Sequence, residues 1–121
     1  MVSIATRQLP EGLAAQAEKI VCALCNEAAR FTARVPKIEL ATLNFTKVID
    51  PGNQQPGYEG VWRNARNDRC GCLTFNSDGS FYAEYDLFCS HPHDARWFIE
   101  MVTAWGKDGT LRVEAQMIPS P

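Results

Sequence analysis

The side chains best suited to chemistry gather in the second half of the chain, where cysteines and histidines lie close together. Residues 89–94 contain one cysteine and both histidines of the sequence, and a Cys-Gly-Cys triplet ends shortly before them at residue 72. Thiolate and imidazole are the ligands that zinc prefers, usually four of them in a tetrahedron. The candidate zinc ligands are Cys70, Cys72, Cys89, His91 and His93.

The spacing C-x-C…C-x-H-x-H matches no tight zinc signature, so the register of the intervening hairpin decides whether the five residues can meet. A two-residue turn would place Cys89 about 7 Å from Cys70 on one sheet face. A three-residue turn at residues 77–79 instead places Cys70 and Cys72 on the face opposite Cys89. We expect the three-residue turn, with the cysteines as small, partly buried sheet residues and zinc binding as an alternative.

A second candidate site is the arginine-rich stretch beside Trp62. Arg63, Arg66 and Arg69 could bind a phosphate or carboxylate, because guanidinium groups recognise such anions in bidentate fashion. The default expectation is a solvated turn between two strands. The sequence shows no nucleophile elbow or nucleotide-binding glycine loop, so we lean against an enzyme.

Composition sets the class of protein. The 121 residues favour a single domain spanning 1–121, with 45% hydrophobic and 21% charged residues. A net charge of −2 gives no basic field for nucleic acid. No apolar stretch is long enough to span a membrane and no signal peptide is evident, so the odd number of cysteines favours a reduced, cytoplasmic setting.

The first predicted element is a long helix over residues 10–34. Apolar residues recur there at three- and four-residue steps, which places them on one helical stripe. Pro10 and Glu11 suit the first turn, and Pro36 ends the helix because proline disfavours helical geometry in the residue before it.

A period of two replaces the helical period over residues 37–118 and predicts an antiparallel meander. In the first of two Asp-Gly hairpins, a three-residue turn pairs Phe75 with Phe81 and Leu73 with Ala83, so apolar residues meet. In the second, a three-residue turn at residues 107–109 would pair apolar residues at nearly every rung. The expected pairs are Trp105 with Leu111, Thr103 with Val113, Met101 with Ala115 and Ile99 with Met117.

The second hairpin has a rival interpretation. Asp94 could cap a helix over residues 95–105, because Trp97, Met101 and Trp105 also fall on one helical face. That alternative gives the order α-β4-α-β. We expect the hairpin instead, because its strand pairing sets apolar residues opposite one another at nearly every rung.

The predicted architecture is α+β, with one long N-terminal helix packed on one face of a curved antiparallel meander of five to six strands. This order resembles several small α+β folds, including cystatin-like ones, a likeness of architecture that implies no function. The uncovered sheet face would carry Tyr82, Phe88 and Phe98 beside acidic residues. Aromatic residues on an open sheet favour a non-enzymatic module that binds another protein or a second copy of itself. A small-molecule or anion pocket between helix and sheet, or a zinc domain, is the alternative.

Overall fold

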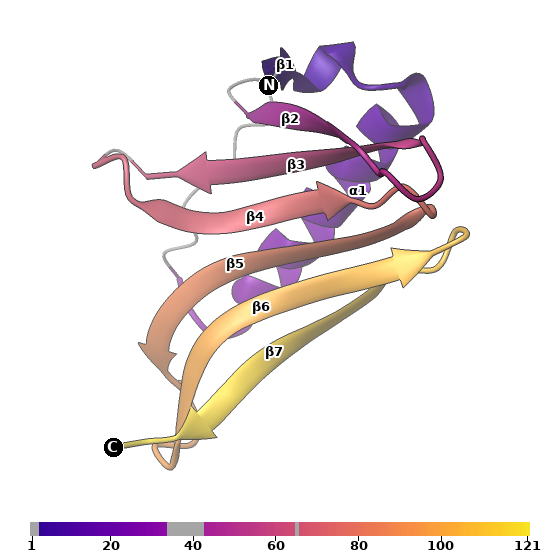
Figure 1. The fold of residues 1–121 in the computed structure, drawn as a ribbon. Helices are drawn as coiled ribbons and strands as arrows, with labels where there is room; N and C mark the ends of the chain where they lie inside the picture. Colours follow the sequence, from indigo (N-terminus) through magenta and orange to yellow (C-terminus); the bar gives the residue numbers. More distant parts are fainter. Residues whose placement is uncertain (1–2, 34–42, 65) are drawn as a thin grey trace.

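The chain folds into one α-helix packed against a seven-stranded antiparallel sheet (Figure 1). The structure is a computed structural model that describes residues 3–33, 43–64 and 66–121. The strands follow one another across the sheet in sequence order, from β1 to β7. The elements are β1 (Ser3–Ala5), the 3-10 turn η1 (Thr6–Gln8), α1 (Glu11–Ala28), β2 (Asn44–Ile49), β3 (Pro56–Arg63), β4 (Arg69–Phe75), β5 (Ser80–Ser90), β6 (Trp97–Lys107) and β7 (Arg112–Pro119).

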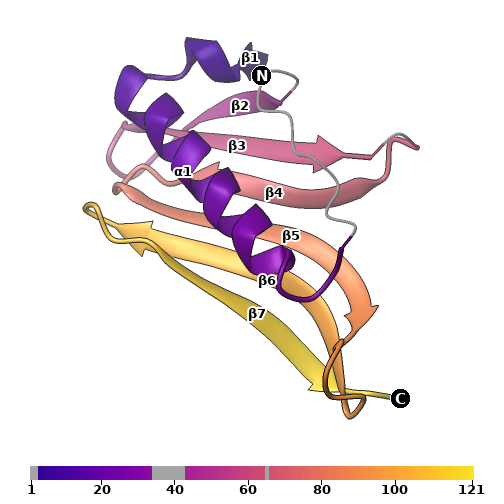
Figure 2. The same ribbon diagram turned by 180° about the vertical axis from the view of Figure 1, so that it is seen from behind.

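The helix α1 forms as its apolar stripe predicts, and it lies across one face of the sheet (Figure 2). We call this the inner face and the opposite one the outer face. The stripe is buried at Ala17, Ile20, Val21, Leu24 and Ala28. The helix ends at Ala28 rather than at residue 34, and a tight turn then buries Phe31. The predicted stop at Pro36 lies outside the described residues. No helix in the described ranges is long and apolar enough to cross a membrane.

The sheet contains seven strands rather than the predicted five to six. The additional strand is β1, which is only three residues long and pairs with the start of β2. So short a segment gives no measurable alternation, which is why the sequence did not indicate it. The predicted meander begins at residue 37. Residues 37–42 are not described, and its first described strand is β2 at Asn44–Ile49.

The first predicted hairpin is confirmed. Phe75 pairs with Phe81 and Leu73 with Ala83, across a three-residue turn whose Gly79 has a φ of 91°. Only glycine adopts such a left-handed conformation without a steric penalty, which is why the turn ends on Gly79. The rungs bury apolar side chains under α1 on the inner face.

The second hairpin also forms, so the helix proposed as an alternative for residues 95–105 is wrong. Its register differs from the predicted one by one residue, because the turn has two residues and not three. Asp108 and Gly109 have φ values of 52° and 85°, and Thr110 N donates to Lys107 O (3.1 Å). Two successive positive φ values define the type I′ turn that Asp-Gly favours.

The shifted register sets Trp105 opposite Arg112 and Val102 opposite Ala115. The predicted pairing of Ile99 with Met117 is nevertheless observed, because β6 carries one extra residue, Glu100, that shifts the register back. The bulge at Glu100 therefore explains why the pairing of Ile99 with Met117 was predicted correctly although the predicted turn was one residue too long.

Bulges bend the lower half of the sheet. On β5 the register shifts between Asp86 and Cys89, so Leu87 and Phe88 together lie opposite the single residue Glu100. The β6 bulge falls at the same Glu100, and two adjacent bulges at one level increase twist and bend strands. Figure 1 shows the resulting curve at the lower ends of β5, β6 and β7.

Candidate functional site

Two of the three aromatic residues predicted as a binding surface lie near each other, and the third lies apart. Phe98 pairs with Ser90, two residues beyond Phe88, and with Ile118 on its other side. Tyr82 is six positions before Phe88 on β5, which corresponds to about 20 Å along a strand. We name Phe88, Phe98 and Ile118 the bulge patch.

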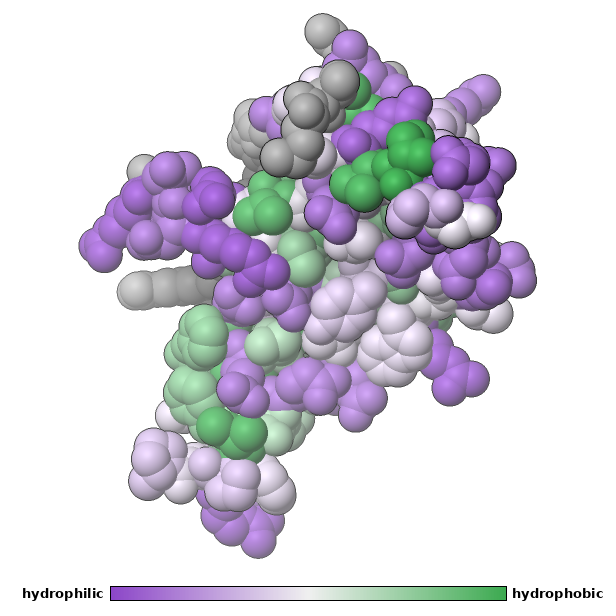
Figure 3. All heavy atoms as spheres, in the orientation of Figure 1, coloured by the Kyte–Doolittle hydropathy of each residue, from purple (hydrophilic) through white to green (hydrophobic). Residues whose placement is uncertain are grey.

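The bulge patch gives the lower end of the sheet an exposed apolar surface. Figure 3, which views the outer face, shows hydrophobic side chains gathered over the lower ends of β5, β6 and β7. The side chain of Phe88 is 62% exposed, and that of Ile118 is 40% exposed. Phe98 is half-buried between them. The patch therefore consists of the largely exposed ring of Phe88 beside the less exposed apolar side chains of Phe98 and Ile118.

The backbone of Phe88 adopts an unusual conformation. Its φ is 49°, in the left-handed region, and it lies at the β5 bulge. This conformation costs a residue with a Cβ about 1–2 kcal/mol, and it is rare for bulky residues. Because the ring is largely exposed, core packing does not account for a phenylalanine at this position.

A polar network lies along β5 above the bulge patch. Tyr82 Oη donates to Glu84 Oε2 (2.9 Å), and Arg69 Nη2 donates to Glu84 Oε1 (2.9 Å). Burial and the hydrogen bond to Glu84 raise the pKa of Tyr82 to about 12. Burial, reinforced by the Glu84 carboxylate, also raises the pKa of Asp86 above its ordinary value. The outer face beside the patch is thus acidic, with one of its carboxylates already paired.

The three cysteines predicted as zinc ligands lie in different environments. Cys70 is the unpaired residue of a bulge between β3 and β4, and its Sγ donates to Trp62 O (3.4 Å). Cys72 lies opposite Glu84, and Cys89 follows the β5 bulge. Burial raises the pKa of all three thiols, which disfavours the thiolate that a metal requires.

The two histidines follow β5 in the loop before β6. The His91 ring makes edge contacts with the rings of Phe31 (5.5 Å between centroids) and His93 (6.2 Å). Among the residues that the structure describes, no three His, Cys, Asp or Glu side chains gather closely enough to hold a metal ion. Zinc binding by the five residues stays a prediction.

The three arginines predicted as an anion site point to separate partners. Arg63 Nη1 donates to Asn67 O (3.0 Å), and Arg69 binds Glu84. Arg66 is exposed in the turn between them, where its backbone N donates to Asn64 Oδ1 (2.9 Å). The structure brings no two of these guanidinium groups onto a common partner, and anion binding stays a prediction.

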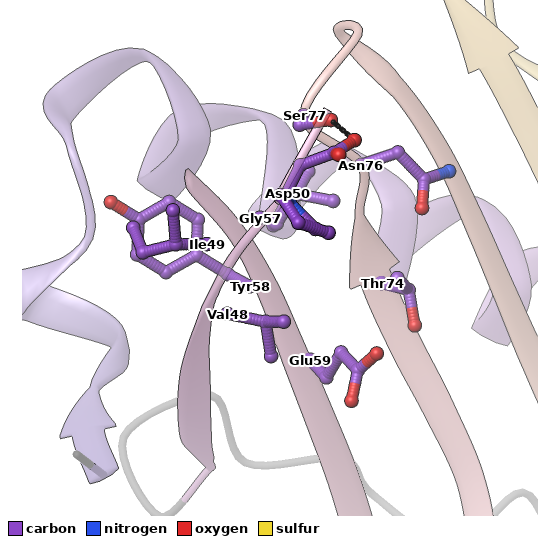
Figure 4. Close-up of a pocket in the computed structure, with 11 residues that line it drawn as sticks. Val48, Ile49, Asp50, Gly57, Tyr58, Glu59, Thr74, Asn76 and Ser77 are labelled. Carbon is purple, nitrogen blue, oxygen red and sulfur yellow. Dashed lines mark hydrogen bonds between the residues drawn. The ribbon is translucent and has the colours of Figure 1, made fainter. Parts of the chain in front are cut away.

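The linings of two hollows were not identified from the sequence, although a pocket between helix and sheet was an expected alternative. One, of about 350 Å³, lies between the β2–β3 loop and the β4–β5 turn (Figure 4). There Ser77 Oγ donates to Asp50 Oδ2 (2.8 Å) and Gly52 N donates to Asp50 Oδ1 (2.7 Å), which lowers the pKa of Asp50. Its carboxylate is therefore already engaged in holding the loop to the turn.

The other hollow is a groove of about 540 Å³ beyond the C-terminal end of α1. On β6 the bulge at Glu100 interrupts the alternation, so that Ile99 and Val102 are both buried although they are three positions apart, which simple alternation does not predict. The groove is lined by Glu27, Arg30, Phe31, His91, Trp97, Val113, Glu114, Ala115, Gln116 and Met117. Arg30 and Glu27 form an ion pair at its rim.

Comparison of the chain with protein-family models, with curated proteins and with solved structures found no match in any of the three.

Proposed function

We propose that this protein is a non-enzymatic binding module that docks another protein chain, or a second copy of itself, on the bulge patch. The observation that supports this most directly is Phe88, whose ring is 62% exposed although its backbone φ is 49°. Backbone strain that core packing does not explain is concentrated at functional positions in proteins. Aromatic side chains are also the commonest anchors of protein interfaces.

The surroundings of Phe88 suggest the chemistry of the partner surface. Phe98 and Ile118 supply apolar contact, while Asp86 and Glu100 lie at neighbouring rungs. The complementary surface is an apolar pocket for the ring with lysine or arginine side chains at its rim, because basic groups compensate the desolvation of nearby carboxylates. The module would act in a reduced, cytoplasmic compartment, which agrees with five free cysteines.

The test is the substitution Phe88→Asn, compared with Ile49→Asn as a matched control. Asparagine tolerates positive φ better than other non-glycine residues, so we expect the thermal stability of the Phe88 variant to stay close to that of the wild type. Ile49 is also an exposed apolar residue, but it lies at the end of β2. Only the Phe88 variant is expected to lose binding.

Binding is read by photocrosslinking from a benzophenone side chain placed at Ile118, in cells that produce the protein. We expect a discrete crosslinked product that persists with Ile49→Asn and disappears with Phe88→Asn; its mass shows whether the partner is a second copy. A crosslink unaffected by Phe88→Asn, or no discrete product, contradicts the proposal.

A further inference from the structure

The strand β7 forms an open edge of the sheet. It pairs with β6 on one side, and no strand in the described part of the chain pairs with its other side. Thr110 N donates to Lys107 O at the turn, and antiparallel neighbours alternate between bonded and non-bonded pairs. The alternation directs the backbone N–H and C=O groups of Val113 and Ala115 toward the open edge. Such a row of groups is a template for another strand.

The side chains of β7 are self-complementary about Val113. Arg112 and Glu114 flank it, both are exposed, and neither forms an ion pair with any other described residue. If a second copy pairs antiparallel with Val113 opposite Val113, then Arg112 of each copy lies opposite Glu114 of the other. The same register sets the exposed Leu111 opposite Ala115, so charges meet on one face and apolar groups on the other.

Other registers that keep each side chain on the same face of the sheet are less favourable than the one centred on Val113. A pairing centred on Glu114 would bring two carboxylates directly opposite each other. A pairing centred on Ala115 would set Arg112 opposite Ile118. It would also continue past Gln116, where the β6–β7 register shifts at the bulge. The charge pattern therefore selects Val113 as the centre.

We propose that two copies of this chain associate edge to edge through β7, with the two-fold axis at Val113 and a continuous antiparallel sheet across both copies. This interface is separate from the bulge patch, and it stands whether or not that patch binds a partner. Because the interface is isologous, each charge pair occurs twice.

The experiment is sedimentation equilibrium of the wild type and of three charge variants. Arg112→Glu and Glu114→Arg each place two pairs of like charges across the axis, whereas the double variant Arg112→Glu/Glu114→Arg restores two opposite-charge pairs. We expect a wild-type dimer, weakening of the dimer by about tenfold or more in each single variant, and recovery in the double variant. Both positions are exposed, and circular dichroism and thermal unfolding of each variant verify the fold.

A wild type that stays monomeric throughout the micromolar range would overturn the proposal. It would mean that Arg112 and Glu114 keep the β7 edge from pairing with another strand. A dimer that the single variants leave intact would overturn it too. If that dimer is lost in Phe88→Asn instead, self-association occurs through the bulge patch, and the two proposals are distinguished.

Discussion

At the scale of single residues, the outer face carries both an exposed aromatic ring, that of Phe88, and a hydrogen-bonded carboxylate, that of Glu84. Phe88 presents a ring to solvent from a left-handed backbone. Glu84 accepts hydrogen bonds from Tyr82 and Arg69, so one carboxylate orders two neighbouring side chains. The sequence places all of these residues on or next to β5, but only the structure shows which are paired and which remain available for contact.

The substitution Glu84→Gln tests the polar network. Burial is the larger cause of the raised Tyr82 pKa, and the hydrogen bond to Glu84 and the negative charge of Glu84 add to it. Removing the charge should bring the pKa of Tyr82 down from about 12 toward, but not to, its ordinary value near 10. Tyrosinate absorbance in a pH titration measures this, with Tyr82→Phe identifying the signal. An unchanged pKa would mean that burial alone raises it.

At the scale of elements, the close approach of β3, β4 and β5 depends on Gly71. A Cβ at Gly71 would lie 2.0 Å from Trp62 Nε1 and 2.3 Å from Glu84 O. The second atom belongs to the backbone and cannot move without disturbing the strand pairing. Trp62 Nε1 is buried without a hydrogen-bond partner in the described residues, which indicates how tightly the indole is packed there.

We therefore expect Gly71→Ala to destabilise the protein by about 3 kcal/mol, the upper range for an overpacked core. Gly12→Ala is the matched control, because a Cβ at Gly12 in α1 has nothing within 4 Å. Alanine is the better helix former, so the control should gain about 0.5–1 kcal/mol. Urea unfolding of both variants measures the difference, and equal stabilities would refute the close packing at Gly71.

At the scale of the whole molecule, two tyrosines with raised pKa values couple folding to high pH: Tyr85 is buried, whereas Tyr82 is 40% exposed. Burial raises the pKa values of Tyr82, to about 12, and of Tyr85, so in the folded state both phenols keep their protons to higher pH than in the unfolded chain. The unfolded state then binds fewer protons above pH 10, and the free energy of unfolding decreases as pH rises.

Burial also raises the pKa of the Cys70, Cys72 and Cys89 thiols, so stability should begin to decrease at about pH 8 to 9 and should decrease further between about pH 10 and 12 as the tyrosines ionise in the unfolded chain. Urea unfolding midpoints across this range measure the effect. Tyr82→Phe should reduce the slope without abolishing it, because Tyr85 still contributes. A midpoint that does not change with pH above 10 would contradict the raised pKa values of both tyrosines.

Local side-chain patterns are sufficient to predict the helix, the strands that follow it and the first hairpin register. Amphipathic periods of 3.6 and 2 residues are local properties, and the apolar pairs around residues 77–79 agree in only one register. The expected strand pairing correctly favoured a strand at Trp97–Lys107 over a helix, although three of its four predicted pairs were wrong by one residue. Of the three residues predicted as a binding surface, Phe88 and Phe98 lie near each other while Tyr82 lies apart, and binding by them stays a prediction.

Only the tertiary structure decided where alternation breaks. The β5 bulge lies opposite Glu100 and the β6 bulge lies at Glu100, and both arise from pairing between β5, β6 and β7, not from any one strand. On β6 the bulge interrupts the alternation, so that Ile99 and Val102 are both buried. The β5 bulge sets the strained backbone of Phe88. The open edge at β7 likewise follows from the order of strands in the sheet, because a strand's position in a sheet is a property of its neighbours and not of its own residues.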